Sequence, residues 1–261
     1  MSTKADAPPA IDVRNLTISY GPRPALLDVS FTVAPGLLVG VIGPNGSGKS
    51  TLIKGIVGFI EPDFGEVRIF GRTMDEVRGE VAYVPQRGEV DWDYPITVRQ
   101  VAMMGRYGYI PWWKNPQPRD HEMVGQALEM VRIADLQHRQ IGQLSGGQQQ
   151  RVFMARALAQ GARILLMDEP FAGVDAATER AILDVLEAAK TRGRTLVVVH
   201  HDLVTAAEYF DRLVLLNQRM FAYGTPEQVL VPSLLSEVYE GSIRSFEMLA
   251  AAEQPGEGRE S

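Results

Sequence analysis

The residues best suited to chemistry form the glycine-rich stretch GPNGSGKST at positions 43–51. It fits the pattern G-x-x-x-x-G-K-[S/T]. There the glycines let backbone amides wrap phosphate oxygens, the lysine reaches the β- and γ-phosphates and the hydroxyl ligates Mg²⁺. Chance produces this pattern in roughly one chain of this length in a hundred. Here it also lies between an apolar strand-like run and an apolar helical run. We therefore expect the phosphate-binding residues to be Gly43, Pro44, Asn45, Gly46, Ser47, Gly48, Lys49, Ser50 and Thr51.

Two adjacent carboxylates end a second apolar run, ILLMDE at 164–169. In a doubly wound sheet, ligands gather at the carboxyl ends of the strands. We expect Asp168 to face the Mg²⁺ held by Ser50, directly or through water, and Glu169 to orient or deprotonate an attacking water. The alternative, a strand that merely runs into an acidic surface turn, is disfavoured by the phosphate loop elsewhere in the chain.

A second potential anion site is LSGGQ at 144–148, at the expected start of a helix. The first amides of a helix are unpaired and its dipole favours negative charge there. Ser145 is a good N-cap, Gly146 and Gly147 permit close approach to phosphate, and Gly161 suits the end of the helix. A flexible loop before a helix is the alternative for these residues taken alone. One domain has no evident use for two γ-phosphate sites about a hundred residues apart.

The elements that must position these residues follow from the hydrophobic pattern. Strands are expected at 12–20, 25–33, 37–43, 65–71, 80–86, 163–170 and 195–202. Helices are expected at 47–60, from 145 onward, at 176–193 and at 203–210, and Asp120 is expected to cap a further helix that carries Met123 and Leu128. The order predicts an α/β fold: a P-loop NTPase core with a mostly parallel sheet, an N-terminal antiparallel β-subdomain and an inserted α-helical subdomain at about 91–160.

Composition sets the limits on class and partners. The chain has 261 residues, a formal net charge of −6 and no cysteine, so disulfides and thiolate metal sites are excluded. The sequence has no block of basic residues, so nucleic acid is not expected as a partner. Its apolar runs are too short to cross a bilayer, and no signal peptide is expected. We expect a disordered N-terminus at 1–10, an ATP-binding domain at 11–230 and a C-terminal extension at 231–261 whose end is disordered.

Taken together, the motifs resemble the ATP-binding subunits of ABC (ATP-binding cassette) transporters over about residues 11–230. The order of the motifs also matches: the phosphate loop, Gln86 after a strand, the LSGGQ signature, the DE pair and a histidine that ends a strand. In that family two chains pair head to tail, and the signature of one closes over the ATP held by the phosphate loop of the other. The resemblance thus implies a homodimer whose signature residues, Ser145, Gly146, Gly147 and Gln148, serve the nucleotide of the partner chain.

Other positions receive roles from the same resemblance. Tyr20 resembles the aromatic residue that stacks on adenine, although it could be an ordinary tyrosine at a strand end. Gln86 matches the glutamine that contacts Mg²⁺ and water, and Asp175 the acidic residue that crosses to the other subunit, although its AGVD context departs from the commoner SALD form. The resemblance implies Glu169, His201 and Gln86 as catalytic residues, Ser50, Gln86 and Asp168 as Mg²⁺ ligands, and ATP with Mg²⁺ as the bound species.

The chain has four histidines, and two of them are adjacent, His200 and His201. Neighbouring strand residues point to opposite faces, so only one can face the γ-phosphate. The family pattern selects the residue before Asp202, which is His201, and leaves His200 packed or exposed. His121 and His138 are isolated and are expected to have structural or surface roles.

All three tryptophans and six of the twenty aromatic residues lie between Asp91 and Trp113. In the family this region faces the membrane subunit, so these aromatics could form a socket for it, or equally the small core of the insertion. They are Trp92, Tyr94, Tyr107, Tyr109, Trp112 and Trp113. The stretch QRGEVDWDYP resembles ATPases of the manganese, zinc and iron uptake group, which are fed by an extracytoplasmic metal-binding protein.

The resemblance therefore implies an ATPase at the cytoplasmic face of the cell membrane that energises import of a transition metal ion, manganese first, through a polytopic permease. The runner-up is a soluble ABC ATPase without transport, such as an iron–sulfur assembly ATPase. A purely regulatory nucleotide-binding module is disfavoured because Glu169 and His201 are both present.

Overall fold

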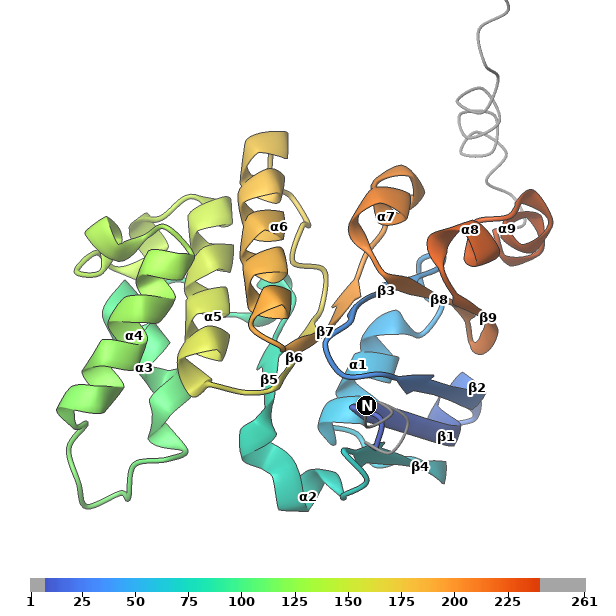
Figure 1. Cartoon of the computed structure of the whole chain (residues 1–261), viewed down its shortest axis with the longest axis horizontal. Helices are drawn as coiled ribbons and strands as arrows, with labels where there is room; N and C mark the ends of the chain where they lie inside the picture. Colours follow the sequence, from blue (N-terminus) through green and yellow to red (C-terminus); the bar gives the residue numbers. More distant parts are fainter. Residues whose placement is uncertain (1–7, 240–261) are drawn as a thin grey trace, which may run out of the picture.

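The computed structural model describes residues 8–239 (Figure 1). Most of the expected disordered N-terminus and the expected disordered C-terminal end lie outside the described residues. Ala10, by contrast, is fully buried, and its amide donates to the carbonyl of Val33 at 2.8 Å. The packed chain thus includes a residue that the sequence assigned to the N-terminal tail.

A three-stranded antiparallel sheet with the order β2-β1-β4 forms the N-terminal β-subdomain, as predicted. Its strands are β1 Ile11–Tyr20, β2 Arg23–Val33 and β4 Phe64–Ile69. β1 and β2 are joined by a tight turn at Gly21, whose φ of +64° suits glycine.

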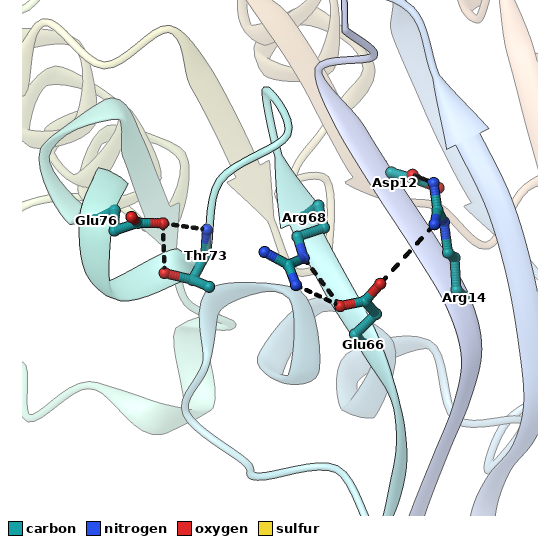
Figure 2. Close-up of polar contacts among 6 residues, drawn as sticks. All are labelled: Asp12, Arg14, Glu66, Arg68, Thr73 and Glu76. Atoms are coloured by element: carbon teal, nitrogen blue, oxygen red, sulfur yellow. Dashed lines mark hydrogen bonds and ion pairs between the residues drawn. The ribbon is translucent and has the colours of Figure 1, made fainter.

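Charged side chains of β1 and β4 pair with one another on one face of this sheet (Figure 2). Arg14 pairs with Asp12 at 2.7 Å and, at 3.9 Å, with Glu66, its register partner on β4. Arg68 pairs with the same Glu66 at 2.8 Å. In the following turn the Glu76 carboxylate accepts bonds from both the amide and the hydroxyl of Thr73, which starts the short helix α2 (Met74–Val77). The pair of Arg68 and Glu66, in which both side chains are exposed, adds little stability.

A six-stranded sheet with the order β5-β6-β7-β3-β8-β9 forms the core. All neighbouring pairs are parallel except β8 and β9, which confirms the mostly parallel sheet. Its strands are β3 Leu38–Ile42, β5 Val81–Val84, β6 Ile164–Met167, β7 Thr195–Val199, β8 Arg212–Asn217 and β9 Arg219–Gly224. Because β3, β5, β6 and β7 run the same way, the residues that follow them meet at one edge.

The central strands are buried on both faces, which explains their unbroken apolar runs. Val39 and Val41 of β3 face one core, which contains α1 (Lys49–Val57) and the antiparallel sheet. Leu38 and Ile42 face the other, which contains the remaining long helices. These include α6 (Ala176–Thr191) and α7 (Leu203–Tyr209), which lie across the sheet from α1 (Figure 1). The short helices α8 (Pro226–Val229) and α9 (Pro232–Val238) end the described chain.

Along the chain, three helices follow β5 and precede β6, and they pack beside the core sheet (Figure 1). They are α3 Val98–Tyr107, α4 Pro118–Met130 and α5 Gly146–Gln160. The expectation that Asp120 caps α4 is wrong, because the N-cap is Gln117 and Pro118 occupies the first turn. Asp120 is the third helical residue, and its carboxylate accepts the amide of Gln117 at 2.9 Å.

The buried ion pair of Arg106 and Asp120 fastens these three helices together. Arg106 Nε donates to Asp120 Oδ1 at 3.0 Å, and both side chains are 9% exposed. Arg106 Nη1 donates to the carbonyls of Ala159 and Gln160, which are among the last acceptors of α5. One guanidinium thus joins α3 to α4 and to the end of α5.

We expect Asp120→Asn to destabilise the protein by about 3 kcal/mol, because the uncompensated Arg106 charge stays buried. The amide can still accept the bond from Gln117, so the helix start is preserved. The free energy of unfolding in urea measures the effect. Asp184→Asn is the matched control, since it breaks the exposed pair with Arg132 and should cost less than about 1 kcal/mol. Equal effects of the two substitutions would contradict this account.

Candidate nucleotide-binding site

The phosphate loop runs from the end of β3 to the start of α1. Gly43, Gly46 and Gly48 have φ angles of +153°, +78° and +96°, which side chains other than hydrogen rarely permit. A Cβ on Gly43 would lie 2.0 Å from the carbonyl oxygen of Leu216. The glycines are therefore required both by backbone conformation and by the close approach of β8.

Lys49 lies inside this loop and is 5% exposed. Its Nζ donates to the carbonyls of Gly43 at 2.9 Å and Pro44 at 2.8 Å. Burial lowers the pKa of Lys49, and the nearby carboxylates of Glu169 and Asp168 oppose that shift. The loop thus encloses an ammonium group that can exchange its carbonyl partners for phosphate oxygens.

A cavity of about 320 Å³ lies over the loop. Residues 45–51 line it together with Tyr20, Ala25 and Glu169. Tyr20 ends β1 and is 57% exposed, so its ring is available for stacking. Gly43 and Pro44 do not line the cavity, but their carbonyls accept hydrogen bonds from Lys49, which does. The structure thus brings the predicted phosphate-loop residues, the predicted stacking residue and the predicted carboxylate together.

Asp168 is fully buried next to the first turn of α1. Its Oδ1 accepts a bond from the Ser50 hydroxyl at 3.0 Å, and its Oδ2 has no hydrogen-bond partner within residues 8–239. Burial raises the pKa of Asp168, and the Ser50 bond opposes the shift. An unsatisfied buried oxygen is costly and suits a hard cation. The pair fits Mg²⁺, which typically takes one or two protein ligands and completes its shell with substrate phosphates and water.

Glu169 joins the ends of three neighbouring strands. Gln86, just after β5, donates from Nε2 to Glu169 Oε2 at 2.8 Å. His201, just after β7, places Nε2 2.7 Å from Glu169 Oε1. The backbone of Glu169 has a φ of +50°, a strained conformation for this residue. This arrangement holds a carboxylate at the cavity wall, where it can accept a proton from a bound water.

The two adjacent histidines have different environments. The His201 side chain is 41% exposed and contacts Glu169, whereas His200 is buried against the rings of Phe171 and Phe210. The Nε2 of His200 lies 2.7 Å from the Thr205 hydroxyl. Burial lowers the pKa of His200 to about 4, so it is neutral at pH 7. His121 and His138 are both exposed on the surface.

The signature residues begin α5 and lie away from the cavity. Ser145 is the N-cap and forms a capping box with Gln148. None of Ser145, Gly146, Gly147 and Gln148 lines the cavity over the phosphate loop. A Cβ on Gly147 would lie 2.4 Å from Thr178 Cγ2, so the signature packs against the start of α6, which Asp175 caps. The structure groups Asp175 with the signature and places both outside the chain's own phosphate cavity.

The aromatic residues between 91 and 113 do not form a single core. Trp92 packs edge-on against Phe153 of α5, with ring centroids 5.2 Å apart. The other five are between 47% and 92% exposed: Tyr94, Tyr107, Tyr109, Trp112 and Trp113.

A groove and one arginine on the surface were not predicted from the sequence. The groove, about 380 Å³, lies between the end of α1 and the helices α3 and α5, and its lining includes Phe59, Met74, Arg78, Tyr83, Met104 and Arg156. The arginine is Arg87, which follows Gln86 and reaches α5. Its only sequence signal is its place in the stretch QRGEVDW.

Neither a metal-binding cluster nor a membrane-spanning helix is found in the described residues. Within residues 8–239 no group of three or more histidine, aspartate and glutamate side chains is placed to hold a metal ion. In the same residues, each helix is too short or too polar to cross a membrane.

The chain matches the ABC transporter family over residues 26–172, just over half its length. It is 51% identical to the manganese transport system ATP-binding protein MntB of Bacillus subtilis, over 89% of this chain and 93% of that protein. It is 50% identical to the zinc transport system ATP-binding protein TroB of Treponema pallidum, over 90% of this chain and 89% of that protein.

Solved structures agree with this match. A metal-chelate type ABC transporter in an inward-facing conformation superposes with a TM-score of 0.80 at 26% identity, covering 89% of each chain. The ADP conformation of the ATP-binding cassette MJ1267 superposes with a TM-score of 0.77 at 29% identity, covering 90% of this chain and 99% of that one. The chain therefore belongs to the ABC transporter family, as one of its ATPase subunits.

Proposed function

We propose that this ATPase energises import of a transition metal ion, with manganese as the first cargo and zinc or iron next. The observation that carries the proposal is the 51% and 50% identity, across about nine-tenths of the chain, to proteins named for manganese and zinc transport systems. These names favour transport over a soluble ABC ATPase such as an iron–sulfur assembly ATPase. The choice of metal rests on them alone, since selection belongs to the subunits that contact the cargo.

The geometry of the cavity supports a division of roles for hydrolysis. Lys49 and the loop amides hold the β- and γ-phosphates, and Tyr20 stacks on adenine. Ser50 and Asp168, joined by Gln86, would hold Mg²⁺, which when bound neutralises charge on the phosphate oxygens. Glu169 accepts the proton of the attacking water, while Gln86 and His201 hold its carboxylate in place. His201 does not itself line the cavity over the phosphate loop, but it contacts Glu169, which does.

We expect Glu169→Gln to lower kcat for ATP hydrolysis by about a hundredfold or more, because general-base catalysis contributes about that much. ATP affinity should change little, since the amide keeps an oxygen for Gln86. Steady-state hydrolysis and nucleotide binding measure the two quantities. Glu179→Gln is the control, as Glu179 lies in the adjoining cavity with Glu169 and His201 but binds neither phosphate nor Mg²⁺ in this proposal. Near-normal turnover of Glu169→Gln would remove Glu169 from the role of base.

The placement of the signature supports a shared site in a homodimer. The start of α5 offers unpaired amides and the positive end of a helix dipole, yet it lies outside the cavity of its own chain. A second copy, packed head to tail, would bring each signature and Asp175 over the nucleotide of the other. Two ATP molecules would then close one dimer.

A mixed dimer tests this arrangement. Lys49→Ala damages one phosphate loop, and Gly146→Asp places a carboxylate at the signature, where only the flexible end of Arg87 must move. Each homodimer has a lesion in both shared sites and should not occlude ATP. A purified mixed dimer has one intact site and should occlude about one ATP per dimer. If each chain used its own two motifs, the mixed dimer would occlude none, and that result would count against the shared site.

The groove between α1 and α3 supports contact with a polytopic permease on the cytoplasmic face of the cell membrane. It combines apolar lining from Phe59 and Met104 with charge from Arg78 and Arg156, a mixture that suits a protein partner. Tyr109 lies nearby, because its hydroxyl donates to the carbonyl of Gly79 at 2.6 Å. An extracytoplasmic metal-binding protein would then act on the permease and reach this chain only indirectly.

We expect the double substitution Phe59→Ala with Met104→Ala to weaken binding of the membrane subunit by about tenfold, because interface energy is concentrated in a few buried apolar anchors. Occlusion of ATP by the purified chain should be unaffected. Phe64→Ala is the control, since Phe64 is an aromatic on β4 that is at least as exposed as Phe59 and does not line the groove. Undiminished binding of the double variant would exclude this groove as the docking site.

A further inference from the structure

The segment 86–92, QRGEVDW, connects the chain's own catalytic carboxylate to its own signature helix. At one end Gln86 donates to Glu169 at 2.8 Å. In the middle Glu89 pairs with Lys54 of α1 at 2.5 Å, on the helix that begins at the phosphate loop. Arg87, which follows Gln86 directly, and Trp92, at the other end of the segment, both contact α5. The proposed function gives a role to Gln86 but none to Arg87 or Trp92.

Arg87 lies directly against the start of α5. Its Nε donates to the side-chain oxygen of Gln149 at 3.2 Å. Its Nη1 lies beside Gly146, since a Cβ there would be 2.7 Å from that nitrogen. Gln149 is 4% exposed and is itself fixed, because its Nε2 donates to the carbonyl of Ile141 at 3.1 Å. An exposed arginine is therefore anchored to a buried side chain of the signature helix.

Trp92 fixes the backbone of Arg87 to the same helix. Its Nε1 donates to the carbonyl of Arg87 at 3.0 Å. Its ring packs on the ring of Phe153, which belongs to α5. Its carbonyl also lies against Gly142, where a Cβ would be 2.9 Å away. Both the side chain and the backbone of Arg87 are thus attached to the region that carries the signature, while the preceding residue is attached to Glu169.

We propose that Arg87 is a positioning residue that acts in trans: it seats the signature helix of its own chain for the nucleotide held by the partner chain. This inference rests on the proposed shared site. Any change at Glu169 that moves Gln86 also moves the next residue, so the state of one site is passed to the helix that completes the other. Because two adjacent residues contact the two sites, the link needs no long chain of intermediates.

The role predicts an asymmetry that a merely structural arginine would not produce. In a mixed dimer with Lys49→Ala in one chain, the only working phosphate loop belongs to the other chain. If Arg87→Ala is added to the Lys49→Ala chain, it affects the signature over the working site, which is the trans arrangement. If it is added to the other chain, it lies in the chain whose own loop works, which is the cis arrangement.

We expect the ATP concentration for half-maximal occlusion to rise about tenfold in the trans arrangement and less than about twofold in cis, relative to the mixed dimer without Arg87→Ala. A tenfold loss of affinity is about what the removal of one hydrogen bond made by a charged group causes. Glu169→Gln in both chains keeps bound ATP from being hydrolysed during the measurement. Circular dichroism and thermal unfolding of each chain report whether the fold is kept.

Two further variants sharpen the test. Trp92→Phe keeps an aromatic side chain against Phe153 but removes the N–H that holds the Arg87 carbonyl, so it should give a smaller effect with the same trans preference. Arg99→Ala is the matched control, because Arg99 also donates to a glutamine in the helical region, Gln137 at 2.7 Å, but lies on α3 away from the signature. It should show no difference between cis and trans.

The outcomes separate this inference from the proposed shared site. If the reference dimer, with Lys49→Ala in one chain only, occludes no ATP, the shared site itself fails. If the reference occludes about one ATP and Arg87→Ala acts equally in cis and trans, or only in cis, the shared site stands and the role of Arg87 is overturned.

Discussion

The position of β3 between β7 and β8 is the constraint on which the rest of the structure depends. Its parallel hydrogen bonds to both neighbours fix where the phosphate loop begins. Gly40 in this strand leaves no room for a side chain, since a Cβ would lie 2.7 Å from Leu213 and 2.8 Å from Phe210. With β3 in place, the residues after β5, β6 and β7 reach the same edge. β5, β6 and β7 pair in parallel with one another, so Gln86, Glu169 and His201, which follow these strands, meet at that edge.

The site that results holds groups whose bonding is incomplete without a ligand. Lys49 is buried with backbone carbonyls as partners, and Glu169 has a strained backbone. Within residues 8–239, Asp168 has one buried oxygen without a hydrogen-bond partner. A folded protein tolerates such costs where binding relieves them. A bound nucleotide would give Lys49 negatively charged phosphate oxygens as partners, and its metal ion would give Asp168 a cation to bind. The same loop and carboxylates thus favour occupation of the cavity.

The phosphate cavity, the signature and the groove lie on separate surfaces of the chain. The phosphate cavity lies on the edge of the core sheet, and the signature with Asp175 lies beside the helical region and outside that cavity. The groove of Phe59 and Met104 lies where α1, α3 and α5 approach one another. The Arg106–Asp120 pair and the contacts of Arg87 and Trp92 hold the helical region at defined points. Movement of that region against the core sheet would therefore change the signature and the groove together.

The sequence by itself determined the parts of the site whose chemistry needs fixed spacing. The phosphate loop, the DE pair and the N-cap of α5 are local patterns, and a few consecutive residues set their geometry. It also determined the alternation of strands and helices, because unbroken apolar runs and helical periodicity reflect burial on two faces or on one. The helix start at Gln117 was missed because Pro118 and the pairing of Asp120 with Arg106 outweigh a carboxylate's preference for the cap itself.

Only the tertiary structure decided the contacts between residues far apart in the chain. The alternation of strand residues left one of two histidines for the site, but packing against Phe171 and Phe210 is what buries His200 and leaves His201 on Glu169. The attachment of Arg87 to Gln149 and Gly146, and the groove between α1 and α3, have no local signature. They arise because packing brings together segments that lie tens of residues apart, and side-chain spacing along one segment contains no information about what another segment places against it.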